Sequence, residues 1–222
     1  QDIVDAKRQG KLSAVLAIEN SDACEGSLNV LRMLHKLGIR SIGLTHNLRS
    51  DAADGNLEDR TKGGLTHFGV ALVKEMNRLG MIVDISHISE RGFYDVLETS
   101  TKPLLASHSC CKALCDHPRN LTDEQIKAMA HHGGSIGVTF VPAFVHPTEP
   151  NLERVVDHID HIVHLAGPHF AGLGSDFDGG GTVLKDATVV PQITASLVRR
   201  GYHREDIEQI LGGNHLRVIK EN

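Results

Sequence analysis

The side chains best suited to chemistry in this sequence stand just after short apolar runs. His87 follows the apolar run 81–85, and His108 follows the run 103–106. A helix-sized segment with one apolar face separates the two runs, so they are predicted to be neighbouring strands of a βαβ unit. Two imidazoles at the ends of adjacent parallel strands can bind one metal ion. The pattern therefore predicts metal binding by these histidines; the alternative is that they are hydrogen-bonded residues at strand ends.

Three other predicted strand ends carry a reactive side chain: Glu19, His46 and Asp176. The carboxylate of Glu19 can bridge two cations with its two oxygens, and Asp176, in the segment GSDFDGG, can act as a general acid or base. The alternatives are an ordinary charged loop residue at Glu19 and an Asx-turn at Asp176. Arg119 follows Pro118 in a predicted loop, where most arginines are simply solvated.

Apolar runs of strand length alternate with helical periodicity along the chain. The predicted strands are residues 12–18, 39–44, 81–85, 103–106, 135–140 and 171–174. Helices are predicted between them, with a capping box at Thr122 and Gln125, and also at residues 192–200 and 204–211. Run 12–18 is expected to be a buried strand. The long polar segment 49–64 is expected to be a functional loop over a site.

The order of these elements predicts the fold class. Alternating βα units with apolar strands indicate a parallel sheet covered by helices. A doubly wound sheet places its site at one switch point, whereas a barrel uses strand ends around its whole top face. Because the candidate residues come from five strand ends, we expect a TIM-type (β/α)8 barrel with about six of its eight βα units present. Residues 1–222 are expected to form a single domain.

The overall composition narrows the function class. A net charge of -5 without a Lys/Arg stripe argues against nucleic-acid binding, and the apolar runs are too short to span a membrane. The four cysteines include no CxxC pair, so free thiols in a reducing cytoplasm are expected. Most of the 15 histidines are expected to be solvated surface residues.

Several segments, taken in order, resemble one known family. They are LAIEN, GIRSIGLTHN, GLTHFGVALVKEMNRLGMIVDISHIS, PLLASHS, the RN of HPRNLTDE, HIDHI, GLGSDFDG and GGNHLRV. Together they cover nearly the whole chain, and they are similar to the membrane (renal) dipeptidase family of zinc metallopeptidases. The resemblance implies a (β/α)8 barrel that holds two zinc ions and hydrolyses small dipeptides by a hydroxide that bridges the metals.

The resemblance also implies a role for each candidate residue. Glu19 is expected to bridge both zinc ions, and His87 and His108 to complete one of the two sites. His46 is expected beside the substrate carbonyl, where it stabilises the developing charge. Arg119 is expected to bind the substrate, and Asp176 to handle the proton at the scissile amide and the amino end.

The sequence departs from the family pattern at three places. The family holds its other zinc with a His-x-Asp pair upstream of the bridging glutamate, and residues 1–18 contain no such pair. The N-terminal strands are therefore expected to be missing from this chain. Asn20 stands where glycine commonly follows the glutamate. In the segment TFVPAF, Phe144 offers no hydroxyl where many relatives have tyrosine, which is expected to shift the substrate range.

The sequence thus predicts a zinc-dependent dipeptidase. Two alternatives remain: a related metal-dependent amidohydrolase acting on another small amide, and a catalytically inactive barrel used for binding. The resemblance further implies a homodimer. A cytoplasmic location is expected, and the polar end of the chain argues against a lipid anchor.

Overall fold

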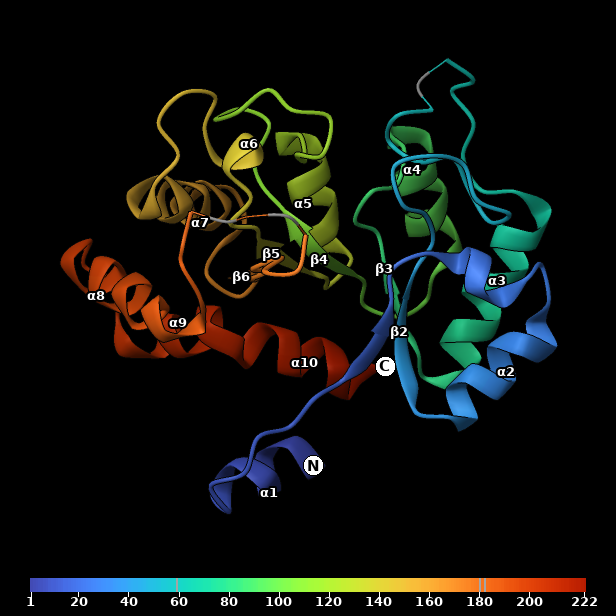
Figure 1. Ribbon diagram of the computed structural model, residues 1–222, viewed down its shortest axis with the longest axis horizontal. Coiled ribbons are helices and arrows are strands. Elements are labelled where there is room, and N and C mark those ends of the chain that lie inside the picture. Colours follow the sequence, from blue (N-terminus) through green and yellow to red (C-terminus); the bar gives the residue numbers. More distant parts are fainter. Residues whose placement is uncertain (59, 180, 182) are drawn as a thin grey trace.

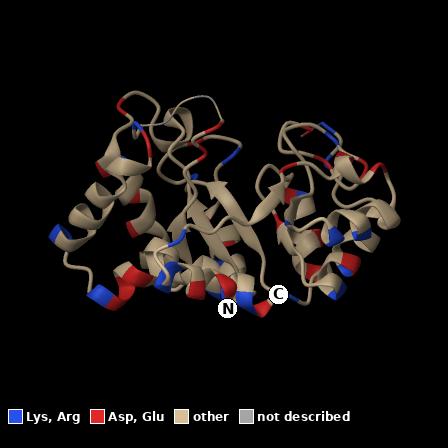
Figure 2. Ribbon diagram, turned by 60° about the horizontal axis from the view of Figure 1, so that its bottom comes forward, with Lys and Arg blue, Asp and Glu red and all other residues tan. Residues whose placement is uncertain are grey.

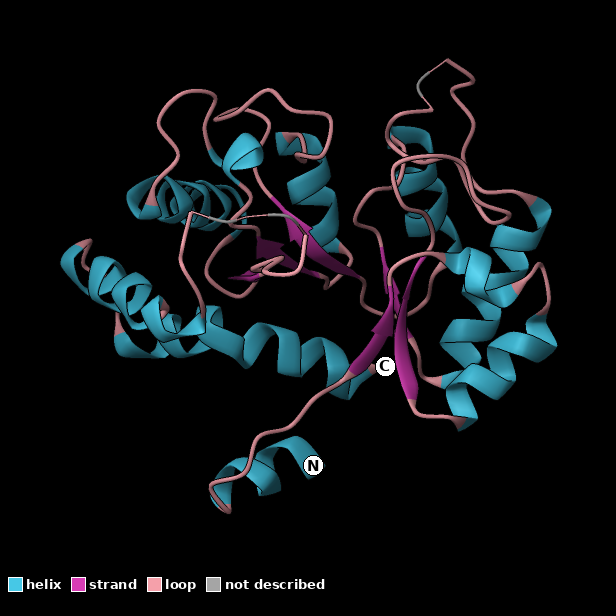
Figure 3. Ribbon diagram, viewed as in Figure 1, coloured by secondary structure: helices cyan, strands magenta, loops and turns pink. Residues whose placement is uncertain are grey.

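The computed structural model describes residues 1–58, 60–179, 181 and 183–222. In this part of the chain, six strands form one sheet in the order β1-β2-β3-β4-β5-β6, and each strand pairs in parallel with the next. Figure 3 shows these strands at the centre with helices grouped on both sides of them. The strands are β1 (Leu16–Ile18), β2 (Ile39–Gly43), β3 (Ile82–Asp84), β4 (Leu105–Ser109), β5 (Ser135–Val138) and β6 (Ala171–Leu173).

Helices connect consecutive strands and flank the sheet (Figure 1). They are α1 (Asp2–Arg8), α2 (Leu28–Lys36), α3 (His67–Leu79), α4 (Glu90–Thr99), α5 (Asp123–His131), α6 (Pro142–Val145), α7 (Leu152–Ala166), α8 (Pro191–Arg199), α9 (Arg204–Glu208) and α10 (Asn214–Glu221). Short 3-10 turns cover Ser21–Cys24 and Ala187–Val189, and a π-helical turn at Gln209–Gly213 joins α9 to α10.

The sequential strand order confirms the predicted fold class. In a doubly wound sheet the strand order reverses at a switch point, whereas in a barrel each strand lies beside its predecessor. The six strands follow the second pattern without a reversal. The sheet is therefore that of a partial (β/α)8 barrel, and the carboxyl ends of all its strands meet at one edge.

Local sequence explains where the helices begin. Thr66, Ser89 and Asn151 each precede a helix, and each side-chain oxygen accepts a backbone N–H of the first turn. At α5 the predicted capping box is confirmed, because Thr122 and Gln125 exchange side-chain and backbone hydrogen bonds. These caps satisfy N–H groups that the helices cannot pair internally. They thereby fix the points at which the strand-end loops stop.

The prediction for run 12–18 is wrong in both length and burial. Only Leu16–Ile18 forms a strand, Leu12 is fully exposed at 101%, and Leu16 is 53% exposed. The physical reason is the place of β1 at the end of the sheet order, where it pairs only with β2. An apolar run on an edge strand has a neighbour on one side only, so the run by itself does not predict burial.

Three other features of the structure differ from the elements predicted from the sequence. The fourth strand begins two residues later than predicted and extends to Ser109, so His108 lies within β4 rather than after it. The proline-containing loop after β5 holds the short helix α6. Helix α10 was not predicted, and it packs near β5 and β6. In Figure 1 it lies below β5 and β6.

The core consists of aliphatic side chains from the strands and from the helices that cover them. Ile42, Val83, Ile136 and Phe93, for example, are at most 1% exposed. Acidic and basic residues are spread over helices and loops on both sides of the sheet (Figure 2). In the part of the chain that the structure describes, no helix is long and apolar enough to cross a membrane.

Candidate metal centre

Three side chains meet at the carboxyl edge of the sheet. The Nε2 atoms of His87 and His108 lie 2.8 Å apart. Glu19 Oε1 lies 3.1 Å from the first and 3.3 Å from the second. The three candidate ligand atoms are all within 4.8 Å of one another. The structure thus brings together the residues that the sequence predicts as metal ligands.

Each of the three comes from a different strand end. Glu19 directly follows β1, and His108 lies in β4. His87 stands three residues after β3, in a left-handed backbone conformation with φ 67°. A residue with a Cβ atom adopts this conformation at a cost of about 1 kcal/mol, so its surroundings must hold it. The carbonyl of His87 accepts the N–H of Asn56 at 2.7 Å, which ties it to the loop 49–64.

Hydrogen bonds at the far side of each imidazole determine which nitrogen faces the centre. His87 Nδ1 lies 2.8 Å from Asn47 Oδ1, which only accepts, so the proton is on Nδ1 and Nε2 carries a lone pair. His108 Nδ1 lies 2.8 Å from the Ser107 hydroxyl. Partners of this kind orient the imidazoles of metal-ligating histidines.

The protonation states also suit a cation. Burial lowers the pKa of His87 to about 4, so its imidazole is neutral at neutral pH. The adjacent imidazoles of His108 and His87 hold the pKa of the Glu19 carboxyl well below its usual range. A carboxylate oxygen and a neutral imidazole nitrogen then face each other with lone pairs, and a cation between them stabilises both. Carboxylate oxygen and imidazole nitrogen are ligands that zinc prefers.

The remaining predicted site residues lie around the same centre. A cavity of about 390 Å³ is lined by Glu19, His46, His87, Arg119 and Asp176, so five of the six predicted residues face one space. The ring of His46 stacks on His87 with centroids 4.3 Å apart. A cavity of this size suits a small substrate rather than a polypeptide.

Arg119 is the buried cation of the site, at 5% exposure. Its Nη2 donates to the carbonyl of His108 at 3.0 Å, and its Nε has no hydrogen-bond partner among the described residues. Burial lowers its pKa to about 10, so it stays charged at neutral pH. A buried guanidinium with an unpaired N–H group is suited to binding an anion.

Asp176 faces the cavity from the loop after β6. Its backbone is left-handed, with φ 58°, and its carbonyl accepts the N–H of Gly179 in a tight turn. A Cβ atom at position 179 would lie 2.3 Å from Asp176 Oδ1, so a larger residue there would have to displace the carboxylate. Residues 176–179 of this segment therefore form a turn that also presents an acid to the cavity.

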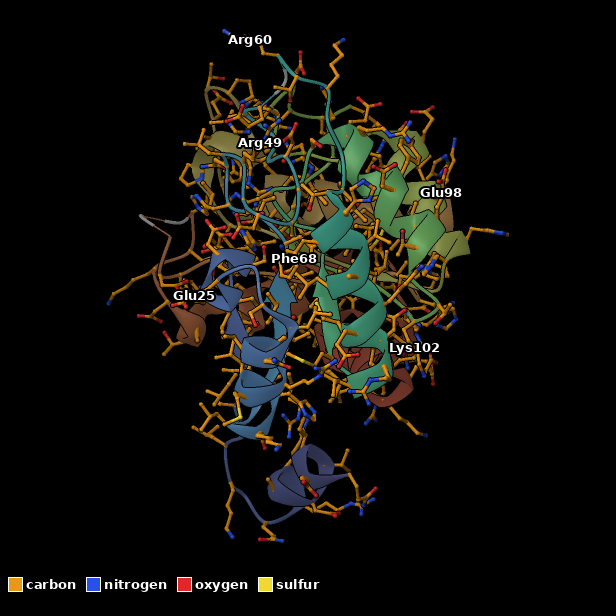
Figure 4. The ribbon with its side chains drawn as sticks, turned by 90° about the vertical axis from the view of Figure 1, so that its right-hand side faces the viewer. Glu25, Arg49, Arg60, Phe68, Glu98 and Lys102 are labelled. Carbon is orange, nitrogen blue, oxygen red and sulfur yellow. The ribbon has the colours of Figure 1, made fainter. Side chains whose placement is uncertain are left out.

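Sequence reasoning missed Asn47, Asn56 and Val141, which also line the cavity. Asn47 was detectable, because it directly follows His46. Phe144 lines the cavity as well, and its ring lies 5.5 Å from the Arg119 guanidinium carbon. Figure 4 shows the loop that carries Arg49 and Arg60 at the end of the molecule opposite to α1.

Comparison with known proteins agrees with this geometry. The sequence pattern of the membrane dipeptidase family (peptidase family M19) matches residues 1–222. This chain belongs to the membrane dipeptidase family. It is 37% identical over 228 residues to dipeptidase tcpJ of Claviceps purpurea (strain 20.1), covering 99% of this chain and 53% of that protein. It is 38% identical over 217 residues to dipeptidase aclJ of Aspergillus oryzae, and this match covers 95% of this chain and 51% of that protein. The chain spans about half the length of these curated relatives.

Solved structures of the family share the fold. One is a metallopeptidase from Rhodobacter sphaeroides with a bound phosphinate mimic of the dipeptide L-Ala-D-Ala. It superposes with a TM-score of 0.91 and 29% sequence identity, and the match covers 99% of this chain and 66% of that one. Another is the probable dipeptidase PvdM from Pseudomonas aeruginosa. It superposes with a TM-score of 0.92 and 26% sequence identity, and the match covers 99% of this chain and 72% of that one. Membership of this family implies that the protein binds metal.

Proposed function

We propose that this protein is a zinc-dependent dipeptidase that hydrolyses the amide bond of small dipeptides. The observation that carries the proposal is the convergence of Glu19 Oε1 with the Nε2 atoms of His87 and His108 beside a cavity of about 390 Å³. Bound zinc supplies a Lewis acid and lowers the pKa of a water molecule that it holds. In this proposal Glu19, His87 and His108 are the ligands.

The other cavity residues have separate roles in the proposal. Arg119 binds the substrate carboxylate through its fixed guanidinium geometry. His46, whose ring stacks on that of His87, stabilises negative charge on the substrate carbonyl oxygen in this proposal. Asp176 binds the amino end of the dipeptide and carries a proton to the leaving amine. The dipeptide mimic bound to the Rhodobacter sphaeroides relative supports this substrate class.

The proposal includes two zinc ions with Glu19 between them. The second ion needs ligands beyond those near Glu19, and residues 1–18 contain no histidine. The homodimer and the cytoplasmic location stay predictions.

A substrate panel tests the proposed function. Hydrolysis of L,L and L,D dipeptides is compared with that of N-acyl amino acids, with zinc added. We expect turnover of dipeptides and none by Glu19→Gln, because an amide is a far weaker zinc ligand than a carboxylate. Glu98→Gln is the matched control, since Glu98 lies on the outer face of α4 (Figure 4). Equal activity of Glu19→Gln and wild type contradicts the ligand assignment; hydrolysis of N-acyl amino acids alone favours the amidohydrolase alternative.

A further inference from the structure

We propose that Asp84 is a positioning residue that holds both candidate metal-binding histidines in register. The inference rests on the proposed metal centre and adds a residue that does not line its cavity. Asp84 is the last residue of β3 and is 9% exposed. A buried carboxylate is costly unless it is hydrogen-bonded, so its partners show what it does.

One oxygen of Asp84 accepts two backbone hydrogen bonds, one from the segment that follows β3 and one from β4. Its Oδ1 lies 3.0 Å from the N–H nitrogen of Ser86 and 3.0 Å from that of Ser107. Each serine directly precedes a histidine of the centre. A single acceptor thus fixes the backbone of both Ser-His segments relative to each other.

The Asp84 carboxylate lies at the point where the hydrogen-bond ladder between β3 and β4 ends. Strands β3 and β4 have one aligned residue pair, Asp84 with Leu105, followed by the Ile85 N–H bond to the Leu105 carbonyl at 2.8 Å. Beyond this point the chain after β3 turns toward the left-handed residue His87. The described residues form no further ladder pair between these two strands, so the hydrogen bonds to Asp84 take the place of those that a longer ladder would provide.

The serine hydroxyls continue this link up to the imidazole of His108. Ser86 Oγ accepts the backbone N–H of His108 at 3.1 Å and lies 3.2 Å from Ser107 Oγ. Ser107 Oγ in turn lies 2.8 Å from His108 Nδ1. When His108 Nδ1 donates a hydrogen bond to the Ser107 hydroxyl, the single ring proton is on Nδ1. The Nε2 atom of His108 then has a lone pair available to a metal ion. Asp84 fixes the backbone of both serines, and so it determines where these hydroxyls lie.

Asp84 contributes a negative charge as well as an acceptor. Burial lowers the pKa of Arg119, and the charge of Asp84 is the largest influence in the opposite direction. The two contributions can be separated, because Asp84→Asn keeps an acceptor oxygen and loses the charge, whereas Asp84→Ala loses both. Positioning through hydrogen bonds predicts that the asparagine variant behaves like the wild type at the histidines.

The test is a Co²⁺ titration of the full 222-residue chain, followed by visible absorption of the bound ion. We expect Asp84→Ala to weaken Co²⁺ binding by about 10- to 100-fold, the usual effect of removing a residue that orients metal ligands, and Asp84→Asn by less than about threefold. Glu75→Gln is the control, because it removes a buried carboxylate that lies on α3 rather than at the centre. Glu75 forms ion pairs with Arg32 and Arg78. If Asp84→Ala does not fold, Asp84→Ser replaces it, because its side chain is too short to reach both amides.

Nitrogen NMR of the histidine rings without metal is the second readout. The wild type and Asp84→Asn are expected to show the Nδ1-protonated tautomer for His87 and His108, and Asp84→Ala a mixture. Wild-type binding by Asp84→Ala together with unchanged ring spectra overturns the proposal. Equal losses for the asparagine and alanine variants overturn it too, since charge would then be the cause. Absence of Co²⁺ binding by the wild type counts against the proposed function, while the ring spectra still decide the role of Asp84.

Discussion

At the scale of single residues, Arg119 carries the sharpest prediction for substrate recognition. Its buried guanidinium has an Nε–H without a hydrogen-bond partner in the described part of the chain, so a substrate carboxylate is its natural acceptor. Arg119→Lys keeps the charge and loses the planar pair of donors. We expect KM for dipeptides to rise by about 10-fold or more with a smaller change in kcat. Steady-state kinetics measure this effect.

A substrate without the carboxylate is the control for that variant. The wild type is expected to hydrolyse a dipeptide C-terminal amide poorly, and Arg119→Lys is expected to lose little further activity toward it. Equal fold losses on the dipeptide and on its amide would show that Arg119 does not recognise the carboxylate.

His158 predicts a pH dependence of stability. Its Nδ1 accepts the N–H of Cys111 at 3.1 Å and its Nε2 donates to the Val145 carbonyl at 2.9 Å, so only the neutral ring fits both partners. Burial lowers its pKa below the ordinary value of 6.5. The folded state therefore binds fewer protons than the unfolded state, and the free energy of unfolding falls as pH drops below about 6.5.

The variant His158→Gln separates this contribution from that of other groups. It is expected to destabilise the protein by about 1–3 kcal/mol at pH 7, because a buried N–H or carbonyl loses its partner. The loss of stability between pH 7 and 5 is expected to be smaller in the variant than in the wild type. Urea unfolding at several pH values tests this, with the exposed His203→Gln as the matched control. An unchanged pH dependence in His158→Gln contradicts the assignment.

At the scale of single elements, the capping box of α5 provides a direct test of local stability. Thr122 accepts the N–H of Gln125 at 3.2 Å, and the Gln125 side chain accepts the N–H of Thr122 at 2.9 Å. Thr122→Ala is expected to lower the free energy of unfolding by about 1 kcal/mol. Ser27, which precedes α2 without a side-chain capping bond, is the control. Ser27→Ala is expected to change stability much less, and equal effects of the two variants would contradict the capping account.

The strands and helices differ in how well they could be predicted from the sequence. Apolar periodicity identified the six strands, because each is a short run bounded by Gly, Pro or polar residues. It failed for the burial of Leu16, since burial of an edge strand depends on which elements lie beside it. Apolar periodicity also did not identify α10. This helix has no side-chain capping bond, and it packs against β5 and β6.

For the site, strand-end position and family resemblance were enough to select six residues. Glu19, His87 and His108 converge as expected, and His46, Arg119 and Asp176 lie around the same centre. The hydrogen bonds that support the imidazoles were not predictable, even though Asn47 directly follows His46 in the sequence. Asn47 and Asp84 act through hydrogen bonds between segments far apart in sequence, and no spacing rule describes such contacts.

At the scale of the whole molecule, the exposed edge of the sheet predicts self-association. β1 ends the strand order, and Leu16 on it is 53% exposed. Exposed apolar edge strands are templates for pairing with other chains, and a lysine on the edge prevents it. We expect Leu16→Lys to reduce association of the 222-residue chain in light scattering, whereas Met33→Lys on α2 has less effect. A wild-type chain that stays monomeric at high concentration contradicts the prediction.

The measurement that tests the central claim most directly is the zinc content of each chain after equilibrium dialysis against excess zinc and removal of weakly bound ions. The account predicts at least one zinc per wild-type chain and its loss in His87→Ala or His108→Ala, while His131→Ala, which removes an imidazole from α5, keeps it. Zinc content that is the same in all four proteins would mean that the ion binds elsewhere, and the proposed metal centre would be wrong.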